Sequence, residues 1–296
     1  MLEIAYVGSR GRQMLLKTNE NQAPPVLGVT NPNINRPFAR IDPALGDLGT
    51  VTSGGFLNYN GLLVKFQRRY ANGFSFMNSY TYGLAVDLSS DNDGGVALVN
   101  TYDRGYNRGA ADYDVKHTFV SNWIYQLPFG KESKLGGWQL GGILYARTGR
   151  ALTITQSQAV QSTGTNASQQ ANNRPNRLLD NINNSDQNID HWFNPAAFQI
   201  VPEPTATFGN AGRNIARGPG YFNIDVNLVK LTRFGRVEHE LRVEAFNVLN
   251  HPAFADPNTT FGNSAFGTIS AMLPNPACAT CGTTERQIQL SMKLKF

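Results

Sequence analysis

The C-terminal end of the chain alternates strictly between apolar and polar residues. Every second residue there is apolar, namely Ile288, Leu290, Met292, Leu294 and Phe296, and the residues between them are polar or charged. A period of two places the apolar side chains on one face of a β-strand and the polar ones on the other. About ten residues is also the length that a tilted strand needs to cross a bilayer. A soluble sheet can also contain such a strand, so the interpretation depends on whether the same alternating pattern recurs upstream.

Composition limits the class of protein. Only 16% of the residues are charged, against about a quarter in soluble proteins. The mean hydropathy is −0.33, and no apolar run reaches the roughly 18 residues that indicate a transmembrane helix. Together with 29 glycines and 10% aromatic residues, this favours a β protein with long polar loops, the composition expected of an outer-membrane barrel.

The net charge of +5 comes from Lys and Arg residues that are scattered singly, with Arg68 and Arg69 as the densest cluster. A nucleic-acid binder gathers its basic residues into one patch with aromatic residues between them. We therefore expect no nucleic-acid partner. The charges are interpreted as spread over strand ends and lumen, and they also suit contact with outer-membrane lipid, because membrane surfaces are anionic.

Seven further stretches repeat the C-terminal pattern. In residues 56–70, for example, Leu62 and Val64 share one face while Lys65 and Gln67 share the other. Together with the tail, the predicted strands 2–8, 56–70, 74–86, 113–127, 138–149, 221–234 and 238–249 make eight. Aromatic residues gather at one end of these strands, where an interfacial girdle belongs: Tyr70, Phe74, Tyr125, Phe129, Trp138, Phe234 and Phe296.

The connections between these strands alternate between short and long. Residues 71–73, 128–137 and 235–236 form short turns, and residues 10–55, 88–112, 150–220 and 250–284 form long loops. All long loops therefore leave from one rim, as the extracellular loops of outer-membrane barrels do. The sequence predicts an all-β fold, about eight strands of an antiparallel transmembrane β-barrel. Residues 156–188 are rich in Asn, Gln and Ser, so we expect a mobile loop tip without a core.

The first eight residues carry neither the basic segment nor the long apolar segment of a signal peptide. A secreted barrel needs such a peptide. We therefore expect residues 1–296 to be the C-terminal part of a longer barrel protein, with the signal peptide and plug domain outside this stretch.

Several motifs resemble one family, the TonB-dependent outer-membrane receptors, in their Oar-like branch of acidobacterial type. The matching stretches are Asn58–Val64, Tyr70–Phe76, Asp112–Phe119, Gln126–Gly130, Trp192–Phe198, Gly209–Asn214, Arg217–Gly220 and Glu244–Phe254. The resemblance implies a plugged barrel of about 22 strands, of which this chain supplies the last eight. It also implies TonB-energised uptake of a scarce solute, such as a siderophore or oligosaccharide, across the bacterial cell outer membrane. TonB would act through the missing N-terminal part, and the C-terminal strand ending in Phe296 would be a signal for the barrel-insertion machinery.

Cys278 and Cys281 form a C-x-x-C motif in the last long loop. Zinc would need two more ligands, and the four histidines lie in other segments; a thioredoxin-like pair would need a βαβ context. An external loop is an oxidising place, which favours a small structural disulfide. Free thiols and a metal or redox role stay as alternatives.

Tyr102, Asp103, Arg104 and Arg108 are the best candidates for a substrate-facing loop. Tyr and Arg together suit sugars or anionic ligands, through stacking and charge-assisted hydrogen bonds. Ordinary loop polarity explains the same residues.

No catalytic constellation emerges from the sequence. His117 has Asp112 and Asp114 nearby, but no nucleophile is defined beside them. We therefore expect no enzyme, no cofactor and no metal. Two rival functions remain, a passive porin or surface adhesin barrel, and a soluble β-sandwich or lectin.

Overall fold

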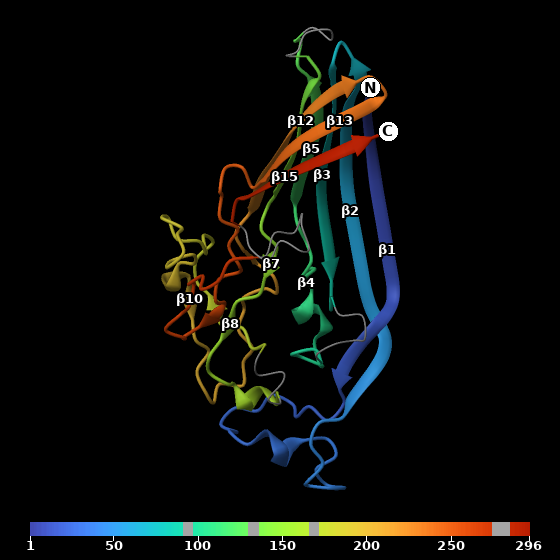
Figure 1. The fold of residues 1–296 in the computed structure, drawn as a ribbon. Coiled ribbons are helices and arrows are strands. Elements are labelled where there is room, and N and C mark those ends of the chain that lie inside the picture. The colour runs from blue at the N-terminus through green and yellow to red at the C-terminus, as the bar shows by residue number, and fades with distance from the viewer. Residues whose placement is uncertain (91–96, 130–135, 166–171, 274–284) are drawn as a thin grey trace.

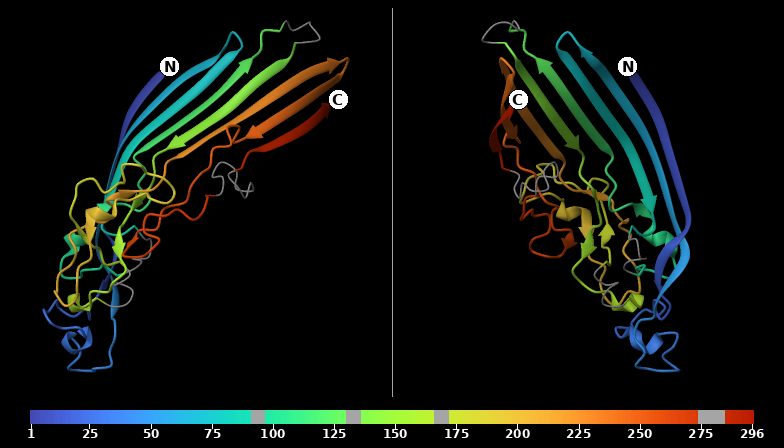
Figure 2. Two further views of the ribbon diagram at one scale, coloured as in Figure 1. Left: turned by 90° about the vertical axis from the view of Figure 1, so that its left-hand side faces the viewer. Right: turned by 45° about the vertical axis from the view of Figure 1, so that its right-hand side comes forward.

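A computed structural model describes residues 1–90, 97–129, 136–165, 172–273 and 285–296. Its main feature is a nine-stranded sheet whose strands follow the order β1-β2-β3-β5-β6-β12-β13-β15, with β4 beside β3. Every pairing in this sheet is antiparallel. The sheet is curved, and the long loops gather at one end of it (Figures 1 and 2). Among the described residues, no helix is long and apolar enough to cross a membrane.

All strands of the large sheet except the short β4 correspond to predicted ones, and β4 lies within the predicted loop 88–112. The strands of the sheet are β1 (Leu2–Asn19), β2 (Gly49–Ala71), β3 (Phe74–Asp87), β4 (Gly109–Ala110), β5 (His117–Gln126), β6 (Trp138–Arg147), β12 (Tyr221–Phe234), β13 (Val237–Phe246) and β15 (Gln287–Lys295). The predicted antiparallel all-β fold is therefore confirmed. The sheet is not closed, because β1 and β15 lie at the two ends of the order and do not pair with each other.

The first hairpin is longer than its sequence pattern indicates. Pairing of β1 with β2 continues to Asn19 and Gly49, so the predicted loop 10–55 shrinks to residues 20–48. A bulge interrupts the register between Arg12 and Met14, where Gln13 has a φ of 55°. The prediction ended this strand at Gly8 because residues 8–12 carry no apolar side chain, and the bulge breaks the period of two beyond them. At the end of β2, where the chain turns into β3, Asn72 and Gly73 have φ values of 52° and 76°. The predicted Asn-Gly hairpin turn requires such positive values.

Strand register joins the apolar residues into one continuous face, since directly paired residues point to the same side of a sheet. One row across the sheet consists of Leu290, Val243, Leu228, Leu140, Tyr125 and Phe74. Among the described residues, none covers the last strand on this side. Its residues Ile288, Leu290, Met292 and Leu294 are 47–72% exposed, and Phe296 beyond it is 95% exposed.

The neighbouring row lies on the opposite face and is more polar. It consists of Gln289, Glu244, Asn227, Gly141, Ile124 and Ser75. Ion pairs join side chains of this face, with Lys295 Nζ 3.0 Å from Glu238 Oε1 and Arg242 Nη2 2.9 Å from Glu240 Oε1. The tail therefore separates an apolar from a charged face, as its alternation predicts.

The long loops cover the polar face at the end of β3. Ala85 and Asp87 point to that face and are buried, whereas Tyr82 and Leu84 on the apolar face are exposed. We call the described residues 20–48, 97–116, 148–165, 172–220 and 247–273 the loop body. It also contains the short pairs β7 (Ala151–Leu152) with β11 (Ala216–Arg217), β8 (Thr155–Gln156) with β14 (Thr260–Phe261), and β9 (Asn176–Arg177) with β10 (Phe198–Gln199). Its four 3-10 helices are η1 (Pro32–Asn35), η2 (Arg104–Asn107), η3 (Gln161–Thr163) and η4 (Pro195–Ala197).

The loop body has a hydrophobic core. Its buried members are Leu152, Ile154, Ile182, Phe193, Ala197, Phe198 and Ala216, and Trp192, Ile215, Phe261 and Phe266 pack against them. The expectation that residues 156–188 bury no core is therefore wrong for the described part of that stretch. Ile182 belongs to this cluster, and Gln156 is buried and exchanges hydrogen bonds with the backbone of Val201. The apolar residues come from separate segments of the sequence, so no local period indicates them.

Candidate functional site

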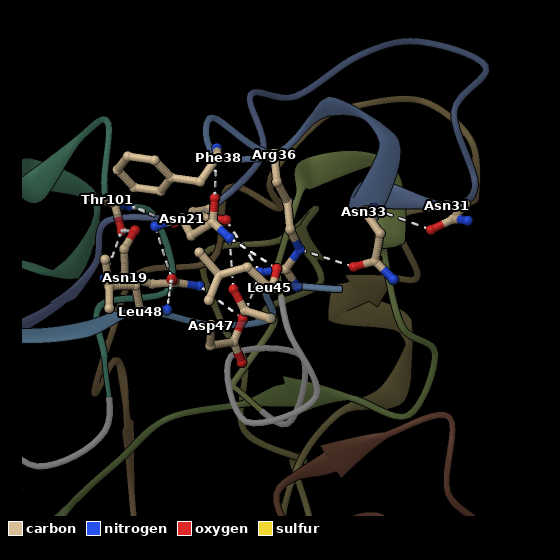
Figure 3. Close-up of polar contacts among 12 residues, drawn as sticks. Asn19, Asn21, Asn31, Asn33, Arg36, Phe38, Leu45, Asp47, Leu48 and Thr101 are labelled. Atoms are coloured by element: carbon tan, nitrogen blue, oxygen red, sulfur yellow. Dashed lines mark hydrogen bonds and ion pairs between the residues drawn. The ribbon is translucent and has the colours of Figure 1, made fainter. Parts of the chain in front are cut away.

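Residues 20–48 are held in shape by a network of asparagines around a buried arginine (Figure 3). Arg36 Nη1 donates to Asp47 Oδ1 at 2.8 Å and to the Asn21 carbonyl at 3.1 Å. Asn21 Nδ2 donates to the carbonyls of Leu45 and Gly46. Side-chain amides thus replace the strand pairing that this segment lacks, which gives the outer end of the first hairpin a fixed shape.

The predicted substrate-facing residues all lie on or next to η2, and all four are exposed. The Tyr102 hydroxyl donates to the Gln22 carbonyl at 2.6 Å, joining this turn to the first loop. Asp103 caps η2 by accepting the Gly105 amide at 2.9 Å. The Arg108 guanidinium lies 5.9 Å from the centroid of the Phe56 ring. The structure thus gives Tyr102 and Asp103 local structural contacts, and their role toward a solute stays a prediction.

The most deeply buried cation of the loop body, Arg174, was not among the predicted site residues. Arg174 is only 2% exposed. Its guanidinium lies 3.6 Å from the centroid of the Tyr106 ring, and its Nη2 donates to the Tyr106 carbonyl at 2.6 Å. The Tyr106 hydroxyl donates to the Gly209 carbonyl at 2.9 Å. Burial raises the pKa of Tyr106 and lowers that of Arg174, as expected when charged forms leave water.

Two further arginines connect the loop body to the sheet. Arg213 donates to Asp87 at the end of β3, to the Asn107 carbonyl at 3.3 Å and to the Ala110 carbonyl at 3.0 Å. Arg217 Nη2 donates to Asp114 Oδ2 at 2.6 Å. Both arginines lie in the glycine-rich stretches Gly209–Asn214 and Arg217–Gly220, which carry the family resemblance. That motif is the one sequence signal that could have identified them.

A cavity of about 170 Å³ lies beside Arg174, Arg213 and the residues that follow β3. Asn107, Asp112, Arg174 and Arg213 are among the residues on its polar side, and Leu88, Leu98 and Val99 line its apolar side. A second, open hollow of about 580 Å³ lies near the short turns, lined among others by Gln67, Asn122 and Asn227. The small cavity is the part of the loop body in which buried cationic groups come together.

The other predicted residues fall in different places. Cys278 and Cys281 lie outside the described residues, so their pairing stays a prediction. His117 is in β5, with its Nδ1 2.7 Å from the Tyr80 hydroxyl. In the part of the chain that the structure describes, no group of three or more His, Cys, Asp or Glu side chains could hold a metal ion.

Comparison with known proteins finds similarity to a protein family but to no individual curated protein. A family model described as "Outer membrane beta barrel domain" matches residues 1–289. No curated protein matches the chain.

Proposed function

The chain belongs to the outer membrane β-barrel domain family and lies in the bacterial outer membrane, and on that premise we propose that it is part of a TonB-dependent receptor. In this proposal it supplies strands to the wall of an Oar-like receptor barrel that takes up a scarce solute, such as a siderophore or oligosaccharide. TonB acts through a part of the receptor outside residues 1–296. The protein binds and transports and has no enzymatic role.

The loop body is the observation that carries this proposal. Its hydrophobic core and its buried arginines hold the loops in a fixed shape over the polar face of the sheet. Binding a scarce solute needs a preorganised surface, because ordering loops on binding costs affinity. A pore for abundant solutes has no such requirement.

The open sheet also supports a larger barrel. Both end strands, β1 and β15, have an edge that no strand of the described sheet pairs, and within a bilayer such edges must be satisfied by further pairing. Additional strands on either side would meet this need and would widen the lumen enough to house a plug. The motifs that resemble Oar-like receptors supply Arg213 and Arg217, which join the loop body to the sheet.

The alternatives are a passive porin and a surface adhesin. The open hollow of about 580 Å³ beside Gln67 and Asn122 favours the porin, because it leaves part of the polar face accessible. Planar-bilayer recording of the full-length gene product separates these functions. A receptor is expected to give no steady conductance without TonB, and labelled solute uptake by cells is expected to stop when TonB is deleted. Steady TonB-independent conductance would establish the porin, and cell adhesion without any uptake would establish the adhesin.

A further inference from the structure

Three arginines from two distant parts of the chain line one hollow beside the first hairpin. Arg10 and Arg12 lie on β1, and Arg108 directly follows η2. Together with Phe56 and Asn58 they line an open cavity of about 240 Å³, which we call the arginine hollow. The Arg108 guanidinium lies 5.9 Å from the centroid of the Phe56 ring. The fold therefore gathers cations that the sequence keeps apart.

No carboxylate of the described residues balances this positive charge. The three arginines are exposed and form no ion pair within the described chain, whereas Arg213 and Arg217 in the loop body pair with aspartates. Arg10 and Arg12 stand two residues apart on one side of β1, about 7 Å by strand geometry, and like charges this close repel each other. An anion from outside the chain would relieve this repulsion.

The arginine hollow continues the apolar, lipid-facing side of the sheet. The register pairs Tyr6 with Leu62, and Leu62 with Tyr82 of the apolar face. Side chains two apart on a strand share a face, so Arg10 and Arg12 lie on the same side as Tyr6. They follow these exposed apolar residues in the direction of the long loops.

The spacing of charges along β2 matches the thickness of a bilayer. Arg68 lies on the same apolar face near the short turn, and Asn58 pairs with Arg10. Between these two residues the strand rises about 33 Å at about 3.3 Å per residue. A tilt of roughly 35–45° reduces this to about 25 Å, the height of the apolar band of outer-membrane barrels. Asn60, the polar residue of this face between them, accepts from the Tyr6 hydroxyl at 2.6 Å. Arg10 therefore lies at the level of lipid headgroups.

We propose that Arg10, Arg12 and Arg108 bind the phosphate groups of a lipid in the outer leaflet. The long loops of outer-membrane barrels are extracellular, so a lipid beside this end of the sheet belongs to that leaflet. Guanidinium groups meet phosphate oxygens through paired hydrogen bonds, and basic pockets at a membrane surface bind anionic headgroups. The acyl chains would lie along Ile4 and Tyr6, which are 64% and 70% exposed. The site does not depend on whether the barrel is a receptor, a porin or an adhesin.

Native mass spectrometry of the full-length gene product in detergent tests the site. The probes are lipid A with two phosphates and the same lipid after removal of both. The phosphorylated probe is expected to bind at least roughly tenfold more tightly than the other. Arg10→Gln combined with Arg12→Gln should weaken binding of the phosphorylated probe by a similar factor. The matched control combines Arg40→Gln with Arg236→Gln, which removes two charges from exposed residues outside the arginine hollow.

A second variant keeps the test decisive if the double substitution in β1 prevents folding. Arg108→Gln removes the third charge and leaves β1 unchanged, and it is expected to weaken binding of the phosphorylated lipid roughly fivefold. The proposal is overturned if the wild type binds both lipids equally well, or binds neither. It is also overturned if the folded variants of the arginine hollow bind the phosphorylated lipid as tightly as the control pair does.

Discussion

Arg217 and Asp114 form an ion pair across 103 positions of the chain, with Nη2 2.6 Å from Oδ2. Asp114 in turn accepts the backbone amide of Ala85 in β3 through its other oxygen, at 2.8 Å. A single carboxylate therefore holds the loop body to the sheet by bonding both. Because the Asp114 side chain is almost fully buried, its charge depends on Arg217 for compensation.

Removal of Arg217 should loosen this attachment. We expect Arg217→Ala to cost about 2–4 kcal/mol of local stability, since it leaves a buried carboxylate without its cation. Native-state hydrogen exchange at the Ala85 amide measures the effect. The control Arg177→Ala breaks a pair whose Asp180 partner is fully exposed, so its cost should be at most ~1 kcal/mol. Equal protection of Ala85 in both variants would contradict the assignment.

The two faces of β15 should differ in environment. Spin labels at Ile288, Leu290 and Leu294 are expected to report lipid, and labels at Gln289 and Lys293 are expected to report water, because the strand register assigns these sets to opposite faces. Accessibility to oxygen and to a polar relaxing agent, measured in reconstituted membranes, checks this. The reverse pattern, or no lipid signal at any position, would remove the basis for a membrane-spanning sheet.

Phe296 should matter for assembly more than for stability. Its side chain is 95% exposed, so the folded protein gains little from it by packing. If it is read by the barrel-insertion machinery, Phe296→Ala should lower the yield of membrane-inserted protein in cells and leave the unfolding midpoint of the inserted fraction unchanged. Lys295→Ala serves as the neighbouring control. A matching loss in both variants would argue against a terminal aromatic signal.

Gly209 is expected to be intolerant of any side chain. An added Cβ would collide with the carbonyl oxygens of Arg174 and Pro175, so Gly209→Ala should cost roughly 1–3 kcal/mol through overpacking. Gly46→Ala is the matched control, because its Cβ would meet nothing within 4 Å. Protease resistance of the loop body in outer-membrane vesicles measures the effect of both substitutions. Unchanged resistance in Gly209→Ala would show that the loops near Arg174 can yield.

The C-x-x-C motif gives a chemical prediction. If Cys278 and Cys281 form a disulfide, alkylation of the native protein should add no mass until a reductant is supplied, and should then add two labels. Labelling before reduction would identify free thiols. Loss of labelling only in the presence of zinc would favour the metal alternative.

The sheet was predictable because its information is local. Alternation in stretches such as 74–86 and 221–234 fixes both the strand and its lipid-facing side, and the Asn72-Gly73 turn fixes a hairpin. The loop body was not predictable in the same way. The contacts that hold it together join residues far apart in sequence, such as Arg213 and Asp87, which are 126 positions apart. No sequence period marks such residues.

The candidate site illustrates the same limit. Tyr102 and Arg108 stood out because aromatic and basic residues occur together in a short loop. Arg174 lies in an Asn-rich stretch without any such signal, and its significance comes from burial beside Tyr106. Only tertiary structure brings it together with Arg213 and Asn107.

The unequal strand lengths have a consequence at the cell surface. β2 has 23 residues and β15 has nine, and at about 3.3 Å per residue the first hairpin continues far past the depth of the hydrocarbon layer. The segment 20–48 at its tip lies farthest from the short turns (Figure 1). Antibodies, phages and other large particles arriving from the medium would contact this segment first.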